Sequence, residues 1–175
     1  MPKLILLNGP PAVGKSTLAR WYADEHPLTL VLEIDAVRAL LGAWLEEWQR
    51  SGTVARRIAL AMARAHLEAG HDVIVPQLLV RRPFAELLEA TAESAGARFH
   101  EFALLDPREV VLARLEQRRE PQGAFSARAL MEKQGNTAGE AYDDFVAALA
   151  ERPDAIVIDD PLSDNAYATL LRLVS

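Results

Sequence analysis

The chain has 175 residues, half of them apolar and a quarter charged, which is typical of one soluble globular domain with a sizeable core. Its formal net charge of −6 argues against a nucleic-acid partner, because such binding usually needs a basic surface. Since it contains no cysteine and no apolar stretch long enough to cross a bilayer, we expect a cytoplasmic protein without disulfides, cysteine metal sites or a membrane partner.

The first predicted elements enclose a phosphate-binding motif. A short apolar run predicts a buried strand at Lys3–Asn8, and a helical pattern covers Lys15–Asp24. Between them the chain reads GPPAVGKST, which fits G-x-x-x-x-G-K-[ST]. The glycines let backbone N–H groups converge on an anion at a helix N-terminus, Lys15 pairs with the β/γ-phosphates, and the Ser16 hydroxyl coordinates Mg²⁺. The motif predicts binding of ATP and Mg²⁺ by Gly9, Pro10, Pro11, Ala12, Val13, Gly14, Lys15, Ser16 and Thr17.

The remaining elements alternate in type along the chain, which indicates an α/β fold. Further strands are predicted at Thr29–Ile34, Asp72–Pro76, Arg98–Leu105 and Ala155–Asp159. Helices are predicted at Ala36–Gln49, Thr53–Ala69, Pro83–Ala95, Pro107–Arg119, Ser126–Gln134, Gly139–Glu151 and Ser163–Leu173. Right-handed crossovers then imply a five-stranded parallel sheet with helices on both faces. We expect residues 1–175 to form a single domain of the P-loop NTPase fold, with strand order 2-3-1-4-5.

Several residues mark the expected boundaries of these elements. Asp35 can cap the helix that follows it, and Asp106 precedes a proline at the first helical position. Gly70 and Gly96 follow helical patterns, where a left-handed residue is favoured. The polar, turn-rich stretch RREPQGAFS begins at Arg118 and predicts a short lid over about residues 118–138.

The chain resembles the small P-loop kinases (AAA_33 or polynucleotide-kinase-like) in three features. These are the phosphate loop, the acidic residue after the second strand in VLEIDAVRALLG, and the arginines in LARLEQRRE. That group includes polynucleotide 5′-kinase, gluconate and shikimate kinases, and chloramphenicol phosphotransferase. Residues 73–119 are also similar to tunicamycin-resistance-type P-loop proteins, which place a proline after the third strand in the same way. The resemblance spans most of the chain, although only the phosphate loop is highly specific.

The resemblance assigns roles to one acid and three arginines. It implies that Asp35 accepts the proton of the attacking hydroxyl, that Arg38 contacts the substrate, and that Arg118 and then Arg114 contact the ATP phosphates. A carboxylate at a strand end also lies where open α/β sheets bind ligands, which independently favours Asp35, with Glu33 as the alternative acid. For each of these residues a simpler alternative stays open: Asp35 as a helix cap, and the arginines as solvated surface charges.

Two further positions concern the acceptor. Many relatives carry an aspartate after the third strand, whereas this chain has Pro76 and Gln77, so we expect Gln77 to bind a neutral polar group of the substrate. Trp44 and Trp48 are spaced one helical turn apart, which is most often a core stripe. The alternative is an aromatic wall for the acceptor, in which Trp44 binds substrate.

These residues together predict an ATP- and Mg²⁺-dependent kinase that phosphorylates a hydroxyl of a small molecule, such as an antibiotic, a nucleoside or a sugar. Lys15, Asp35 and Arg118 are the expected catalytic residues. The alternatives are a protein that binds and sequesters its ligand without phosphoryl transfer, and a polynucleotide 5′-kinase. A homodimer is an open alternative to a monomer.

Overall fold

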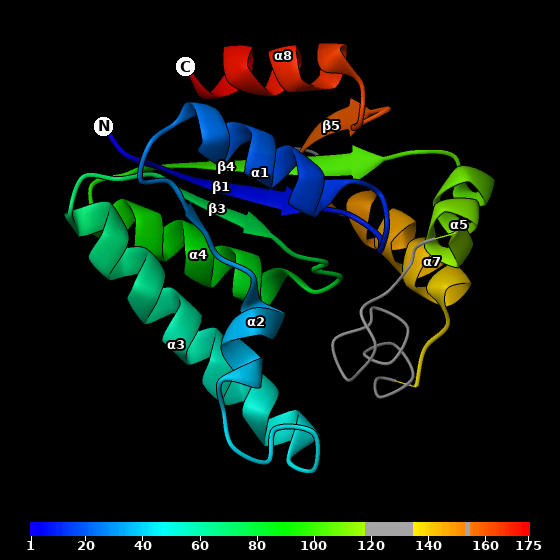
Figure 1. Ribbon diagram of the computed structural model, residues 1–175, viewed down its shortest axis with the longest axis horizontal. Coiled ribbons are helices and arrows are strands. Elements are labelled where there is room, and N and C mark those ends of the chain that lie inside the picture. Colours follow the sequence, from blue (N-terminus) through cyan, green and yellow to red (C-terminus); the bar gives the residue numbers. More distant parts are fainter. Residues whose placement is uncertain (118–134, 153–154) are drawn as a thin grey trace.

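A computed structural model of the chain describes residues 1–117, 135–152 and 155–175. Five parallel strands form one sheet in the order β2-β3-β1-β4-β5, as the sequence predicts (Figure 1). The strands are β1 (Lys3–Asn8), β2 (Leu30–Val31), β3 (Val73–Pro76), β4 (Arg98–Leu105) and β5 (Ile156–Asp159). The helices are α1 (Lys15–Glu25), α2 (Ile34–Ala39), α3 (Trp48–Glu68), α4 (Arg82–Ser94), α5 (Arg108–Gln117), α7 (Ala138–Leu149) and α8 (Asp164–Val174).

The sheet separates two apolar layers, because successive side chains of a strand point to opposite faces. Leu4 and Leu6 of β1 pack with buried residues of α3 and α4 on one face. Ile5 and Leu7 pack with buried residues of α1 and α8 on the other. Figure 1 shows α3 and α4 below the sheet and α8 above it, with α1 drawn across the strands. Since both faces are covered, β1 is completely buried apart from its first residue.

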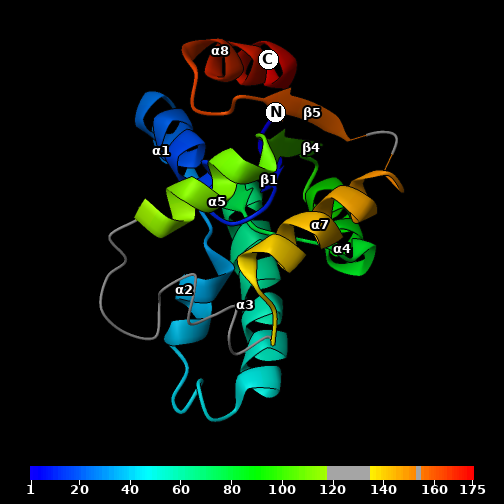
Figure 2. The same ribbon diagram turned by 90° about the vertical axis from the view of Figure 1, so that its right-hand side faces the viewer.

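The carboxyl ends of the strands meet at the edge of the sheet next to α5 and α7 (Figures 1 and 2). Leu115 of α5 and Ala141 of α7 form a small apolar cluster there with Ala12, which precedes α1, and Leu78, which follows β3. Contacts between α5 and α7 hold the two helices together. Thr137 caps α7 in a capping box with Glu140, which fixes where that helix begins. The phosphate-loop motif therefore lies at the same edge as the segments that follow β2, β3 and β4.

The region from β2 to the end of α3 differs from the prediction in several ways. The strand expected at Thr29–Ile34 is confined to Leu30–Val31, and α2 already begins at Ile34. The helix expected at Ala36–Gln49 ends at Ala39 in the structure, and α3 then runs without a break through Gly52, where a helix boundary was expected. Glu33 occupies the N-cap position of α2, so the prediction that Asp35 caps this helix is wrong.

Other boundaries agree with the sequence. Gly70 (φ 89°) and Gly96 (φ 67°) adopt the left-handed conformation just after α3 and α4, as predicted. The expected helix Ser126–Gln134 and most of the expected lid, residues 118–134, lie outside the described residues. No helix in the described ranges combines the length and apolar character needed to cross a membrane.

Candidate active site

The phosphate loop connects β1 to α1 in a backbone conformation that its glycines make possible. Gly14 has φ 113°, a region that L side chains rarely adopt, and a Cβ built there would lie 2.7 Å from Leu162 Cδ2. At Gly9 the constraint is space, because a Cβ would lie 2.8 Å from the carbonyl oxygen of Leu104 at the end of β4. The two glycines of the motif are therefore fixed by different causes, one by backbone conformation and the other by close packing against the sheet.

The loop carries positive charge toward its centre. The first turn of α1 brings no acidic side chain to offset the helix dipole. Lys15 curls back across the loop, where its Nζ donates hydrogen bonds to the carbonyl oxygens of Gly9 (2.8 Å) and Pro10 (2.7 Å). A cationic amine and a helix N-terminus at a glycine-rich turn form an anion-binding site of the kind that holds phosphates. The residues thus fit the polyphosphate that the motif predicts.

Magnesium would depend on few protein ligands here. In the described ranges no group of three or more histidine, aspartate or glutamate side chains is arranged to hold a metal ion. Ser16, in the first turn of α1, is the residue whose hydroxyl fits a magnesium ion shared with bound phosphates. Mg²⁺ keeps several waters and binds through substrate phosphates in such sites, so one protein hydroxyl is compatible with it.

Asp35 faces this loop from the first turn of α2. Its carboxylate accepts a hydrogen bond from the Gln77 side chain and interacts electrostatically with Arg38, Arg56 and Lys15. Burial raises the pKa of Asp35 above its usual range, and the cations and the hydrogen bond only partly oppose that effect. A carboxylate with a raised pKa is a stronger base at neutral pH. Glu33, the alternative acid, instead reaches toward Arg20 of α1 at 3.9 Å.

Gln77 reaches Asp35 from the end of β3, the strand that lies between β1 and β2 in the sheet. Its backbone N–H donates to the carbonyl oxygen of Leu7 (3.0 Å), which extends the pairing of β3 with β1 by one residue. The side chain that stands where relatives carry an acid therefore contacts the expected base directly. Contact between Gln77 and a substrate stays a prediction.

Arg38 is buried instead of being solvated. Only 6% of the residue is exposed, so the alternative of a surface arginine is wrong. Its Nε donates to Ser51 Oγ (2.9 Å), its Nη2 donates to the carbonyl oxygen of Trp48, and its guanidinium carbon lies 3.2 Å from the centroid of the Trp48 ring. Gly52 leaves room for this group, since a Cβ there would lie 3.2 Å from Nη2. These contacts join α2 to α3, and substrate contact by Arg38 stays a prediction.

Trp44 lies in the turn before α3 and Trp48 is the first residue of that helix. Both side chains are half-buried, so the expected core stripe is wrong. Their ring centroids are 6.2 Å apart at an interplanar angle of 41°. The Trp48 ring is covered by the Arg38 guanidinium, and the carbonyl oxygen of Trp44 accepts a hydrogen bond from Ser51 Oγ (2.8 Å). Whether Trp44 contacts an acceptor stays a prediction.

Of the two arginines expected at the ATP phosphates, one can be placed. Arg114 of α5 forms an ion pair with Asp106, whose side chain is 7% exposed, at the carboxyl end of β4. The pair fixes Arg114 at the same edge of the sheet as the phosphate loop. Arg118 lies outside the described residues, so its predicted role and the predicted phosphate contact of Arg114 stay predictions.

A buried polar network beneath the site was missed from the sequence. Asn8 Oδ1 accepts from the Leu79 N–H (2.8 Å), and Asn8 Nδ2 donates to the Leu79 carbonyl (3.1 Å), which ties the segment after β3 to the end of β1. Arg152 donates to the same carbonyl (3.1 Å) and pairs with Glu101 at 2.5 Å. An asparagine directly before the phosphate loop is the signal that could have revealed this support for Gln77.

The sheet order, the loop at the end of β1 and the acid after β2 define the fold of the P-loop kinases. The match of residues 4–139 to the AAA_33 family, described as an AAA domain, covers most of the chain. The chain therefore belongs to this family. No curated protein matches the sequence.

Solved structures of P-loop proteins share the fold at low sequence identity. A sugar kinase from Janibacter sp. HTCC2649 is 20% identical over 99% of this chain and 94% of that one, with a TM-score of 0.65. The tunicamycin resistance protein of Deinococcus radiodurans is 22% identical over 100% and 96%, with a TM-score of 0.64. The APS kinase of Mycobacterium tuberculosis, in complex with AMPPNP and APS, is 20% identical over 98% and 96%, with a TM-score of 0.65.

Proposed function

We propose that the protein is an ATP-dependent phosphotransferase that moves the γ-phosphoryl group of ATP to a hydroxyl of a small molecule. The observation that carries this proposal is the position of Asp35, whose partly buried carboxylate interacts electrostatically with Lys15 of the phosphate loop. A motif that binds a triphosphate is common to motors, switches and kinases. A carboxylate of raised pKa beside it favours transfer to a hydroxyl, because it can accept the hydroxyl proton.

In the proposed reaction these residues have the following roles. The acceptor hydroxyl donates a hydrogen bond to Asp35, and its proton passes to the carboxylate as the oxygen attacks the γ-phosphorus. The bond between the γ-phosphorus and the β,γ-bridging oxygen breaks, and ADP leaves with the electron pair. Lys15 leaves the loop carbonyls to offset the charge of the phosphates, and Gln77 orients Asp35 throughout. Mg²⁺ held with the help of Ser16 supplies further neutralisation of phosphate charge.

The test is a screen of hydroxyl compounds with ATP and Mg²⁺, read by mass spectrometry. We expect at least one acceptor to gain the mass of one phosphoryl group, with loss of this product when Asp35 is replaced by asparagine. Sugars, nucleosides and hydroxylated antibiotics form the first panel. A short 5′-hydroxyl oligonucleotide is included to test the polynucleotide-kinase alternative, which the net charge of −6 disfavours.

A protein that binds its ligand without transfer is the second candidate. The likeness to the tunicamycin resistance protein and the neutral Gln77 at the end of β3 favour it. Under this alternative, ATP binds with normal affinity, a ligand of the panel binds beside it, and no phosphorylated product forms over long incubation. The same mass measurement, combined with equilibrium binding, therefore separates the two candidates.

A further inference from the structure

One face of α3 looks toward α2 and carries three residues spaced four apart. Trp48, Gly52 and Arg56 follow one another at single helical turns and therefore share that face. The Arg38 guanidinium lies over the Trp48 ring and occupies the space that a Cβ at Gly52 would approach to 3.2 Å. The next turn of the same face thus brings Arg56 beside α2, at the level of the turn that carries Asp35.

Arg56 also touches the neighbouring helix α4. Its guanidinium carbon lies 5.7 Å from the centroid of the Phe84 ring, a distance at which a cation is attracted to an aromatic face. Phe84 is 8% exposed and belongs to the core, whereas Arg56 is exposed to solvent. The ring therefore lies near the guanidinium of a side chain that remains exposed to solvent.

The two arginines near Asp35 differ in whether their N–H donors are already used within the protein. Arg38 is buried, and its guanidinium donates to Ser51 and Trp48. No carboxylate in the described part of the chain lies within 4.0 Å of Arg56, which interacts with Asp35 only over a longer distance. A solvent-accessible fork of donors beside a base is suited to a planar or tetrahedral oxyanion.

We propose that Arg56 binds an anionic group of the acceptor, so that the site selects hydroxyl compounds that also carry a carboxylate, phosphate or sulfate. The inference rests on the proposed function and names the substrate class of that site. The acceptor places its hydroxyl at Asp35 and its oxyanion at Arg56, and Arg38 serves to hold α2 against α3. In this proposal Arg56, one helical turn beyond Gly52, makes the acceptor contact that the family resemblance implies for Arg38.

The test compares matched acceptor pairs that differ in charge: gluconate with glucose, and APS with adenosine. Each compound is added to protein saturated with ADP and Mg²⁺, and binding is followed by tryptophan fluorescence, since Trp44 and Trp48 lie beside α2. Transfer is then measured with ATP. We expect the anionic member of at least one pair to bind more tightly than its neutral counterpart, with an affinity that falls as ionic strength rises.

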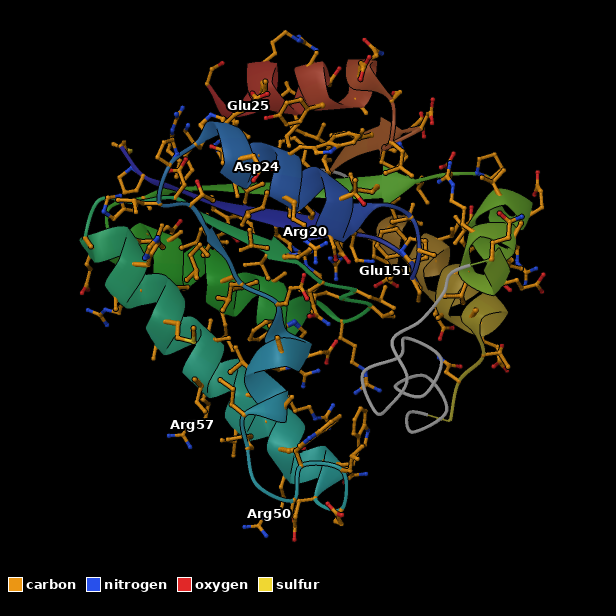
Figure 3. All side chains as sticks on the ribbon, viewed as in Figure 1. Arg20, Asp24, Glu25, Arg50, Arg57 and Glu151 are labelled. Carbon is orange, nitrogen blue, oxygen red and sulfur yellow. The ribbon has the colours of Figure 1, made fainter. Side chains whose placement is uncertain are left out.

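Arg56→Gln and Arg57→Gln form a matched set of variants, because each removes one positive charge from α3. Arg57 is exposed and points away from α2 (Figure 3). We expect Arg56→Gln to weaken binding of the anionic acceptor by about 10–100-fold, the range for a lost hydrogen bond to a charged group, while Arg57→Gln leaves it unchanged. The KM for ATP should be the same in both variants.

The outcomes separate this inference from the proposed function. Binding that depends on Arg56 without any transfer contradicts the kinase proposal and leaves the anion site intact. Transfer that is equal in wild type and Arg56→Gln supports the kinase and overturns the anion site. The anion site is also overturned if no anionic member binds more tightly than its neutral partner, or if the substitution changes only the KM for ATP.

Discussion

Replacing Asp35 with asparagine should abolish most of the activity and preserve the fold. Asparagine has nearly the same volume, and its Oδ1 can still accept the hydrogen bond from Gln77, so the packing of α2 is retained. The variant lacks only the group that accepts the hydroxyl proton. Loss of a general base predicts a fall in kcat of about 10²–10⁴-fold, equivalent to about 3–5 kcal/mol in the barrier. The KM for ATP should stay close to that of the wild type.

The stability of this variant follows from the direction of the pKa shift. Burial raises the pKa of Asp35 in the folded state, so the contribution of this group to stability is full below its unfolded pKa and is lost as pH rises through the folded pKa. Above the folded pKa the ionised carboxylate is therefore a cost to folding. We expect Asp35→Asn to match or exceed the wild type in free energy of unfolding at pH 7, as measured by urea denaturation.

The pH dependence of kcat completes this test. The pH profile of kcat for the wild type should show an acid limb above the ordinary aspartate pKa of about 3.9, and Asp35→Asn should lack it. A variant that turns over at the wild-type rate would show that Asp35 is not the base. A variant with low activity and a much lower unfolding free energy would show instead that the carboxylate is structural.

Three further substitutions test the parts of the site separately. Lys15→Ala should both weaken ATP binding and lower kcat, because this amine neutralises phosphate charge in bound ATP and in the transition state. Equilibrium titration and steady-state kinetics measure the two effects. Arg38→Ala should lower the free energy of unfolding by about 1.5–3 kcal/mol, because its hydrogen bonds are lost. The control Arg57→Ala should change it by less than about 0.5 kcal/mol. If urea denaturation gives the same unfolding free energy for both variants, Arg38 does not link α2 to α3. Gly14→Ala should cost about 1–3 kcal/mol in the same assay through backbone strain, while Gly42→Ala, where a Cβ meets nothing within 4 Å, should be nearly neutral.

The sequence predicted the sheet and the phosphate loop because both depend on local patterns. Buried parallel strands appear as continuous apolar runs, and the loop requires glycine at Gly9 and Gly14 for reasons that no other residue satisfies. The glycines after α3 and α4 were predicted for the same reason, since a left-handed residue at a helix end has few alternatives.

The errors between β2 and β3 arose where tertiary contacts override local signals. Gly52 disfavours helix by itself, yet it lies within α3, where a Cβ would make a tight approach of 3.2 Å to Nη2 of Arg38. The tryptophan spacing suggested a helical core stripe, but Trp48 is covered by that same guanidinium and Trp44 lies in the preceding turn. Local hydrophobic periodicity does not reveal that the Arg38 guanidinium lies beside Gly52 and over the Trp48 ring.

The sequence indicated individual residues of the candidate site but not the contacts between them. The sequence singled out Asp35, Gln77 and Lys15 separately, whereas the structure brings the first into contact with the second and into electrostatic interaction with the third. The partners of Arg114 and Asn8 could not be predicted, because each pairs with a residue from another part of the fold. Such pairs depend on how elements pack, which a single sequence does not encode in its spacing.

The most direct test of the account is the stoichiometry of the reaction with the best acceptor found in the screen. ADP, phosphorylated acceptor and inorganic phosphate are measured in the same reaction over time. We predict one phosphorylated acceptor for each ADP and little inorganic phosphate, because Asp35 serves the acceptor hydroxyl beside the phosphate loop. Formation of ADP with an equal amount of inorganic phosphate, and no phosphorylated acceptor, would contradict phosphoryl transfer as the function of this site.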